Sequence, residues 1–176
     1  NIHGQDDSQK VEKVTLRSML PEKQEMRRSY PAMLRGSALG SALGALPGVG
    51  PSIAAFMSYA IEKRVAKDPS QFGKGAVQGI SAPESANNAA AQTAFVPSLS
   101  LGIPGDAVMA IMLGALIIHG ITPGPMLINE QPEMFWGLVV SFFIGNIMLV
   151  LLNIPTIGVW VSLLRIPFTW LYPAIL

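Results

Sequence analysis

The chain has 176 residues, half of them hydrophobic, a charged fraction of 13% and a mean hydropathy of +0.42. Charged residues make up roughly a quarter of an ordinary soluble domain, so this composition disfavours a water-soluble protein and predicts residence in a membrane. The absence of Cys excludes a disulfide framework and thiolate metal sites, and the presence of only two His disfavours a zinc site.

Basic residues are confined almost entirely to the first part of the chain. Eleven of the twelve Lys and Arg lie at or before Lys74, the twelfth is Arg165, and none lies between Ala76 and Leu164. A soluble surface needs charge at about a quarter to a third of its positions. We therefore expect lipid or other apolar protein to cover that span. The chain starts with Asn1 and stops within an apolar run, so we also expect a fragment of a longer protein.

Residues 1–35 are polar and mix basic with acidic side chains, with Pro21 and Pro31 as breaks. This composition predicts a connector that lies in the cytoplasm or along the membrane surface. The remainder, residues 36–176, is then the transmembrane region.

The segment Gly36–Ala60 contains 25 uncharged residues, enough to cross a bilayer once, but residues 46–51 read LPGVGP. Basic residues flank the segment on both sides, and the positive-inside tendency places both flanks in the cytoplasm. A single crossing cannot satisfy that requirement. A re-entrant hairpin can, with its Pro-Gly turn near the middle of the membrane. Irregular backbone at that depth is tolerated only beside protein or water, so we expect the turn to line a cavity.

Small residues dominate the next segment, 76–105. Ser81 and Glu84 have the S-x-x-E spacing of a capping box, which predicts a helix from about Ala82 to Pro97. A break follows at Gly102–Gly105.

Asp106 is predicted to cap a strongly apolar helix over 107–118, which ends at His119. Its twelve residues are too few to span lipid, which takes about 20. We therefore expect two short helices that meet at an unwound centre and form one discontinuous crossing.

The 21 uncharged residues from Met134 to Ile154 predict an ordinary membrane-spanning helix, which Pro155 ends or kinks. The preceding sequence NEQPE has two acids and no base, as expected on the outer side. Beyond Pro155 the composition is typical of an interfacial segment, with Trp160, Arg165, Trp170 and Tyr172.

Three stretches combine a Gly or Pro break, or paired Asn residues, with Ser or carboxylate side chains: Pro47–Ser52, Glu84–Asn88 and Gly102–Asp106. Discontinuous helices of transporters direct their N-termini at anionic substrates, while unwound carbonyls hold a coupling cation. The candidate substrate-binding residues are Pro47, Gly48, Gly50, Ser52, Ser85, Asn87, Asn88, Gly102, Pro104 and Gly105. The candidate cation ligands are Glu84, Asn87, Asn88 and Asp106.

Other interpretations of these stretches stay open. Small residues and Pro kinks also serve close helix packing, and both Glu84 and Asp106 suit helix N-termini. The sequence GALPGVGPS lacks the G-K-[ST] ending of a phosphate loop. An intramembrane serine hydrolase, using Ser81, Ser85 or Ser98 with His119, has no supporting spacing, and His119 is better explained as an interfacial polar residue.

The segments GALPGVGPSIAAFMSYAIEKRVAKDPSQFGKGAVQGISAPESANNAAA and LGIPGDAVMAIMLGALIIHGITPGP resemble the large membrane subunit of the tripartite tricarboxylate transporter family. The resemblance runs from about Arg17 to the end. It implies an all-α, multi-pass secondary transporter of the bacterial inner membrane, built from two related halves, with this chain in the second half. It further implies uptake of citrate or related carboxylates, driven by a cation gradient, together with a small membrane subunit and a periplasmic binding protein.

No enzyme activity, nucleic acid or resident cofactor is implied. A carboxylate substrate would meet no Lys or Arg between Ala76 and Leu164, so backbone N–H groups, Ser and Asn donors and a co-bound cation must balance its charge. Na⁺ suits the oxygen ligands present, and H⁺ transport through Glu84 or Asp106 stays open, as does an Arg from the other half. The alternative is a non-transporting scaffold or channel segment, in which the Pro-Gly turns serve packing only.

Overall fold

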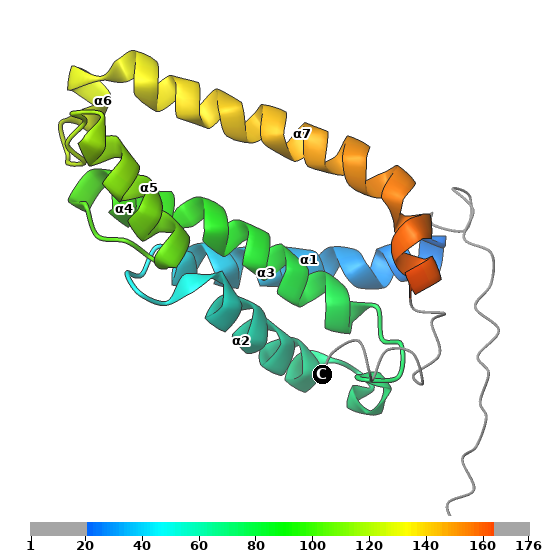
Figure 1. Ribbon diagram of the computed structural model, residues 1–176. Coiled ribbons are helices and arrows are strands. Elements are labelled where there is room, and N and C mark those ends of the chain that lie inside the picture. Colours follow the sequence, from blue (N-terminus) through cyan, green and yellow to red (C-terminus); the bar gives the residue numbers. More distant parts are fainter. Residues whose placement is uncertain (1–20, 164–176) are drawn as a thin grey trace, which may run out of the picture. The chain divides into compact units, whose positions relative to one another are not determined.

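A computed structural model of the protein describes residues 21–163, and within that range every regular element is a helix, which confirms the all-α prediction (Figure 1). The chain divides into two compact units, one over Glu22–Gly137 and one that includes the residues from Leu138 onward. Residues 1–20 of the predicted connector, and Arg165, Trp170 and Tyr172 of the predicted interfacial segment, lie outside the described residues. The helices are α1 (Lys23–Gly44), α2 (Gly50–Val65), η1 (Pro69–Gln71), α3 (Gln78–Thr93), α4 (Phe95–Leu101), α5 (Ala107–Ile118), α6 (Leu127–Glu130) and α7 (Pro132–Leu163).

Helices α1 and α2 form a helical hairpin whose turn, residues 45–49, we call the hairpin tip (Figure 1). Gly48 and Gly50 have φ angles of +81° and +68°, in the left-handed region that Gly adopts without steric cost. Pro51 occupies the first turn of α2, where a missing N–H costs nothing. The Gly and Pro residues therefore reverse the chain, as the sequence predicted.

The hairpin is packed against α3 through small residues at every fourth position. Gly40 of α1 lies so close to α3 that a Cβ atom there would be 2.6 Å from the Cα atom of Ala86, inside van der Waals contact. Gly36 and Gly44 are equally tight against the backbones of Ala82 and Ala90. Since residue numbers increase together on both helices, α1 and α3 are parallel. Stripes of small residues that bring backbones together are typical of helix packing in membranes.

Helix α1 starts at Lys23, so Pro31 does not break the chain as predicted but lies inside the helix. Pro31 forfeits one backbone hydrogen bond, yet Ser29 and Ala32 on either side of it are buried. Packing on the buried face therefore outweighs the local preference. The helix also crosses the expected boundary between residues 35 and 36.

Helix α3 begins at Gln78, four residues before the predicted start. The prediction of a capping box at Ser81 and Glu84 is therefore wrong. The Ser81 hydroxyl oxygen is buried without a hydrogen-bond partner. Gly79 explains the earlier start because it is packed against Phe72, whose ring stands edge-on to Tyr59 at a centroid distance of 5.5 Å. This contact places the first turn of α3 before Ser81.

The helix predicted to end at Pro97 is interrupted earlier and continues further: α3 ends at Thr93, and α4 carries Pro97 in its first turn. The break that follows is confirmed, because Gly102 has a φ angle of +68° and helix α5 starts only at Ala107. The bounds of α5, 107–118, agree with the prediction.

Helix α7 contains the predicted spanning segment and is the one helix of the described residues that is long and apolar enough to cross a membrane, over Pro132–Val161, with a mean hydropathy of 2.3. Pro155 does not end it. The Asn153 amide and the Thr156 hydroxyl donate to the carbonyl oxygens of Leu149 and Leu152, at 2.8 and 2.9 Å, within the same helix. Polar groups that bond within their own helix are compatible with surrounding lipid.

Candidate functional site at the hairpin tip

The two Pro-Gly breaks of the sequence lie side by side. A Cβ atom on Gly50, at the start of α2, would be 3.7 Å from the Cβ atom of Asp106 and 3.8 Å from the carbonyl oxygen of Gly105. A side chain at position 50 would therefore be in ordinary van der Waals contact with the second break. Two stretches more than fifty positions apart in the sequence therefore meet at one place in the fold.

Ser98 holds the second break in this position. Its side chain is fully buried, and its hydroxyl lies 2.7 Å from the carbonyl oxygen of Ala94 and 3.3 Å from that of Ile103. Gly105 is packed against Ala94, where an added Cβ would lie 3.1 Å from the alanine Cβ. The segment after α4 thus folds back onto the junction between α3 and α4, which brings Asp106 to the hairpin tip.

Two helix N-termini meet here, those of α2 and α5. Helix α5 is capped as predicted, because Asp106 Oδ1 accepts a hydrogen bond from the N–H of Met109 at 2.8 Å. Helix α2 has no side-chain cap. The first N–H groups of a helix lack intrahelical partners and carry the positive end of the helix dipole. The arrangement therefore presents backbone donors next to one carboxylate.

An open groove of about 520 Å³ lies between α2 and α3, and its polar residues include Ser52 and Asn87. Both were predicted as substrate-binding residues, and the structure brings them to one surface. The rest of the lining is Ala55, Phe56, Tyr59 and Pro83. Ser52 is in the first turn of α2, so the groove begins next to the hairpin tip.

The other candidate residues have different surroundings. Ser85 and Asn88 donate hydrogen bonds to the carbonyl oxygens of Ser81 and Glu84, at 2.6 and 2.8 Å, within α3. Glu84 is exposed and does not line the groove. The remaining candidates are exposed residues of the two breaks: Pro47, Gly48, Gly102 and Pro104.

The sequence did not indicate an ion pair at the opposite end of the hairpin from the tip. Arg35 of α1 donates two hydrogen bonds to Glu62 of α2, from Nε to Oε2 at 2.9 Å and from Nη2 to Oε1 at 2.6 Å. The Glu62 side chain is only 3% exposed. A signal for its burial exists, because Glu62 continues the every-fourth-residue series of Ala54 and Ser58, both buried on α2.

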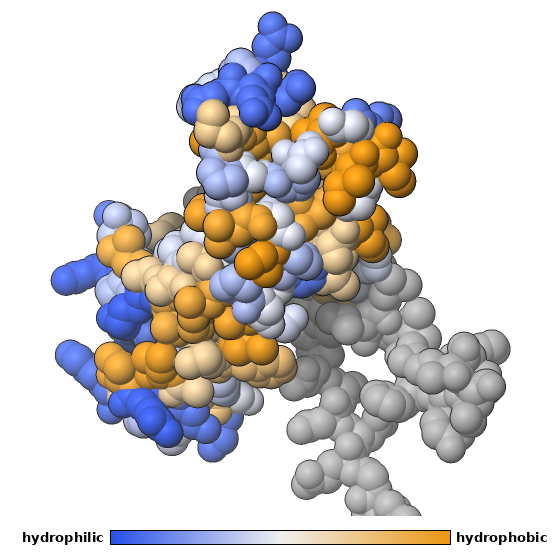
Figure 2. Space-filling view, turned by 90° about the vertical axis from the view of Figure 1, so that its left-hand side faces the viewer, coloured by the Kyte–Doolittle hydropathy of each residue, from blue (hydrophilic) through white to orange (hydrophobic). Residues whose placement is uncertain are grey.

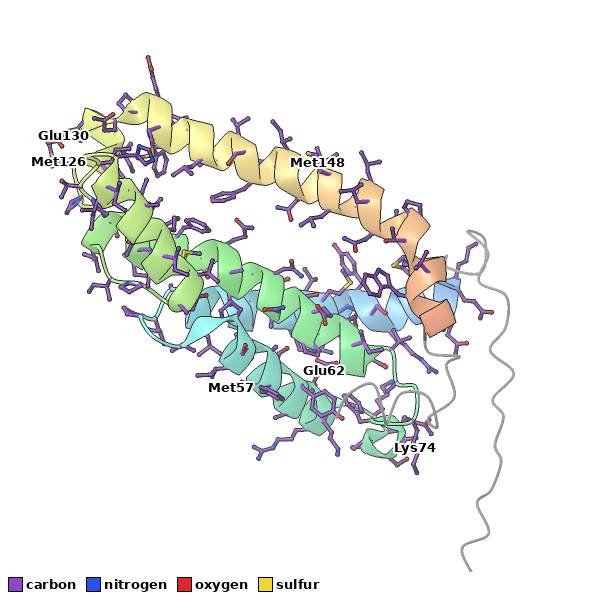
Figure 3. All side chains as sticks on the ribbon, viewed as in Figure 1. Met57, Glu62, Lys74, Met126, Glu130 and Met148 are labelled. Carbon is purple, nitrogen blue, oxygen red and sulfur yellow. The ribbon has the colours of Figure 1, made fainter. Side chains whose placement is uncertain are left out.

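Many large hydrophobic side chains are exposed, and Figure 2 shows hydrophobic areas interspersed with polar ones on the face that it presents. On α2 the exposed apolar side chains include Phe56, which is 78% exposed, and Met57, labelled in Figure 3. A separate, almost wholly apolar pocket of about 220 Å³ lies between α4 and α6, with Leu99 and Leu127 in its wall. Exposed apolar area on this scale is typical of surfaces that lipid or other protein covers.

The sequence matches the model of the tripartite tricarboxylate transporter TctA family over residues 1–176. Two similar proteins of Agrobacterium vitis are the "Uncharacterized 52.8 kDa protein in TAR-I ttuC' 3'region", 54% identical over 153 residues, and the "Uncharacterized protein in TAR-II ttuC' 3'region", 56% identical over 136 residues. The alignments cover 87% and 77% of this chain but only 30% and 56% of those proteins. No solved structure matches.

Proposed function

Because this chain belongs to the tripartite tricarboxylate transporter TctA family, we propose that it forms part of the membrane subunit of a multi-pass secondary transporter in the bacterial inner membrane. The proposed cargo is a di- or tricarboxylate such as citrate, taken up with Na⁺ or H⁺. The proposed partners are a small membrane subunit and a periplasmic binding protein that delivers the substrate. The observation that carries the proposal is the meeting of the two helix N-termini at the hairpin tip.

The dimensions of the hairpin support a re-entrant segment. Arg35 and Glu62 form an ion pair and therefore lie at the same height along the hairpin. Residues 36–61 between them carry no charge. The nine residues from Gly36 to Gly44 advance about 14 Å at 1.5 Å per residue, which is close to half of the roughly 30 Å hydrocarbon core. If the ion pair lies at the cytoplasmic interface, the hairpin tip reaches the middle of the membrane.

Helix α5 supports the second half of a discontinuous crossing. It starts beside the tip, at Asp106, and leads away from the hairpin (Figure 1). Its twelve residues extend about 18 Å. The length of the hairpin and the length of α5 add up to about the thickness of the hydrocarbon core. The unwound residues 102–106 then lie near its centre.

In the proposed mechanism the carboxylate groups of the substrate bind the unpaired N–H groups at the start of α2 and the donors of Ser52 and Asn87. Between residues 76 and 163 the chain has no Lys or Arg to offset that charge. A cation held by carbonyl oxygens of residues 102–105 and by the carboxylate of Asp106 supplies the balance, with Asn87, Asn88 and Glu84 as further candidate ligands. Substrate and cation would then stabilise each other's binding, which couples their transport.

Uptake of labelled citrate by the complete complex tests the proposed function. We expect Asn87→Ala and Ser52→Ala each to raise the KM for the carboxylate about tenfold or more, because a hydrogen bond to a charged group contributes about 1.5–3 kcal/mol. Membrane content of each variant is measured by immunoblot. Gly48→Leu is a poorer probe, because the φ angle of +81° strains any side chain there.

The matched control for Asn87→Ala is Asn146→Ala on α7, whose amide donates to the carbonyl oxygen of Phe142 in its own helix. Its KM should equal that of the wild type. Unchanged KM values in both groove variants, at normal membrane content, would instead favour the scaffold alternative, in which the breaks serve packing only.

Labelling of single introduced cysteines tests the topology. Arg28 and Lys67 are exposed beyond the two ends of the uncharged hairpin segment, and Glu130 lies at the far end of the same compact unit (Figure 3). We expect a membrane-impermeant maleimide to label cysteines at 28 and 67 from the cytoplasmic side and at 130 from the periplasmic side. Labelling of 28 and 67 from opposite sides would rule out a re-entrant hairpin.

A further inference from the structure

We propose that Arg35 and Glu62 are positioning residues, which together set the location of the hairpin tip and so the affinity of the site there. The inference rests on the proposed function only for its transport readout. Neither residue belongs to the candidate site. The pair joins α1 and α2 at the opposite end of the hairpin from the turn.

Burial of the Glu62 carboxylate costs folding free energy, so its presence on the buried face of α2 calls for an explanation. The buried face of α2 consists of Ala54, Ser58 and Glu62 at four-residue intervals, so a carboxylate stands where small residues otherwise pack. A buried carboxylate is strongly unfavourable unless it is paired and hydrogen-bonded. The guanidinium of Arg35 satisfies both oxygens with two separate hydrogen bonds. Such a two-point contact fixes orientation as well as distance.

Helix α2 also packs against α3, but within residues 21–163 the Arg35–Glu62 pair supplies the only side-chain hydrogen bonds between α1 and α2. Helix α1 is attached to α3 along the whole stripe of Gly36, Gly40 and Gly44. Helix α2 joins α1 covalently at the tip and electrostatically through Glu62. Its side chains between these ends are small where they are buried and large where they are exposed. Without the ion pair, the buried carboxylate of Glu62 would be left unpaired, and we expect α2 to rotate about its own axis until that carboxylate reaches water.

A rotation of α2 about its axis would turn the residues at its N-terminus away from the site. Gly50 lies beside Gly105 and Asp106, so that an added Cβ would be in van der Waals contact with both, and Ser52 lines the groove with Asn87. Misplacement of binding groups by about 1 Å costs up to roughly a hundredfold in activity. A change at Glu62, twelve positions along α2 from Gly50, is thus expected to alter binding at a site that it does not touch.

A charge swap in the complete complex tests the inference. We expect Arg35→Glu and Glu62→Arg each to raise the KM for citrate about tenfold, beyond any loss of membrane content. The double variant, which restores opposite charges, should recover most of the wild-type KM. The matched control is Lys63→Glu, an exposed charge reversal next to Glu62 on the same turn, which should leave the KM unchanged.

A second readout needs no transport. A cysteine at Leu46, which is 51% exposed at the tip, is labelled with a water-soluble maleimide in each background. Both single reversals should change the labelling rate several-fold, and the swap should restore it. Reduced membrane content with unchanged KM and labelling rate would overturn the inference, because the pair would then only stabilise the fold. Restored labelling in a complex that takes up no citrate would leave the inference standing and contradict the proposed function.

Discussion

Gly40→Leu is expected to abolish the folded hairpin. A Cβ atom at Gly40 would lie 2.6 Å from the Cα atom of Ala86, and the obstructing atoms are backbone, which cannot turn aside. Overpacking of a close-packed interior costs about 1–3 kcal/mol even where side chains can adjust, so we expect a loss of about 3 kcal/mol or more here. The measurement is the thermal unfolding midpoint and the monodisperse yield of the purified membrane subunit.

The control for this substitution is Gly114→Leu on α5. Gly114 is also a glycine within a helix, yet no atom lies within 4 Å of a Cβ built there. The same change in side-chain volume and hydrophobicity should therefore change the free energy of unfolding by no more than about 0.5 kcal/mol, the usual range for surface changes away from special features, and leave the midpoint almost unchanged. A similar loss in both variants would mean that leucine is generally harmful, and that the stripe has no special role.

Asp106→Asn is expected to lower cation-dependent uptake about tenfold or more while the protein stays folded. Asn caps a helix about as well as Asp does, so the bond to the Met109 N–H is retained and only the charge is lost. If Asp106 helps to hold the coupling cation, the apparent affinity for Na⁺, or the dependence on the proton gradient, must fall. The measurement is citrate uptake across a series of Na⁺ concentrations at fixed pH, repeated at a second pH.

Asp106→Ala separates the two roles of this side chain. It removes the cap as well as the charge, which costs about 1 kcal/mol of helix stability. We expect it to lower the unfolding midpoint below that of Asp106→Asn, with the same effect on uptake. Normal uptake by Asp106→Asn would show that the residue serves only as a cap, and the cation would then have to bind elsewhere.

Local chemistry made a good part of this structure predictable. The Pro-Gly turn of residues 46–51 and the Asp106 cap follow from the preferences of single residues, and both are present. The bounds of α5 were predicted correctly because an N-cap and a Gly at its two ends agree with its apolar run. The position of Gly50 beside Asp106 depends on tertiary packing, which the preferences of single residues do not reveal.

The predictions that were wrong concern residues whose structure depends on distant contacts. Pro31 was expected to break the chain but lies inside α1, and Pro155, expected to end or kink its helix, does not end α7. The motif at Ser81 failed because packing of Gly79 against Phe72 starts α3 earlier. Arg35 and Glu62 are 27 positions apart, and no local pattern links them. The four-residue spacing on α1 and on α2 indicates which residues share a face. It identifies Arg35 and Glu62 as partners only once the helix that packs against each face is known.

The glycine stripe also limits how α1 and α3 can move. Contact between them is backbone against backbone, and it offers no rotamers through which the interface could adapt to a small displacement. Only a slide by one full repeat of four residues, about 6 Å, would bring the next glycine opposite an alanine again. We therefore expect these two helices to move as one rigid block, and any smooth, graded motion to be confined to the elements attached around them.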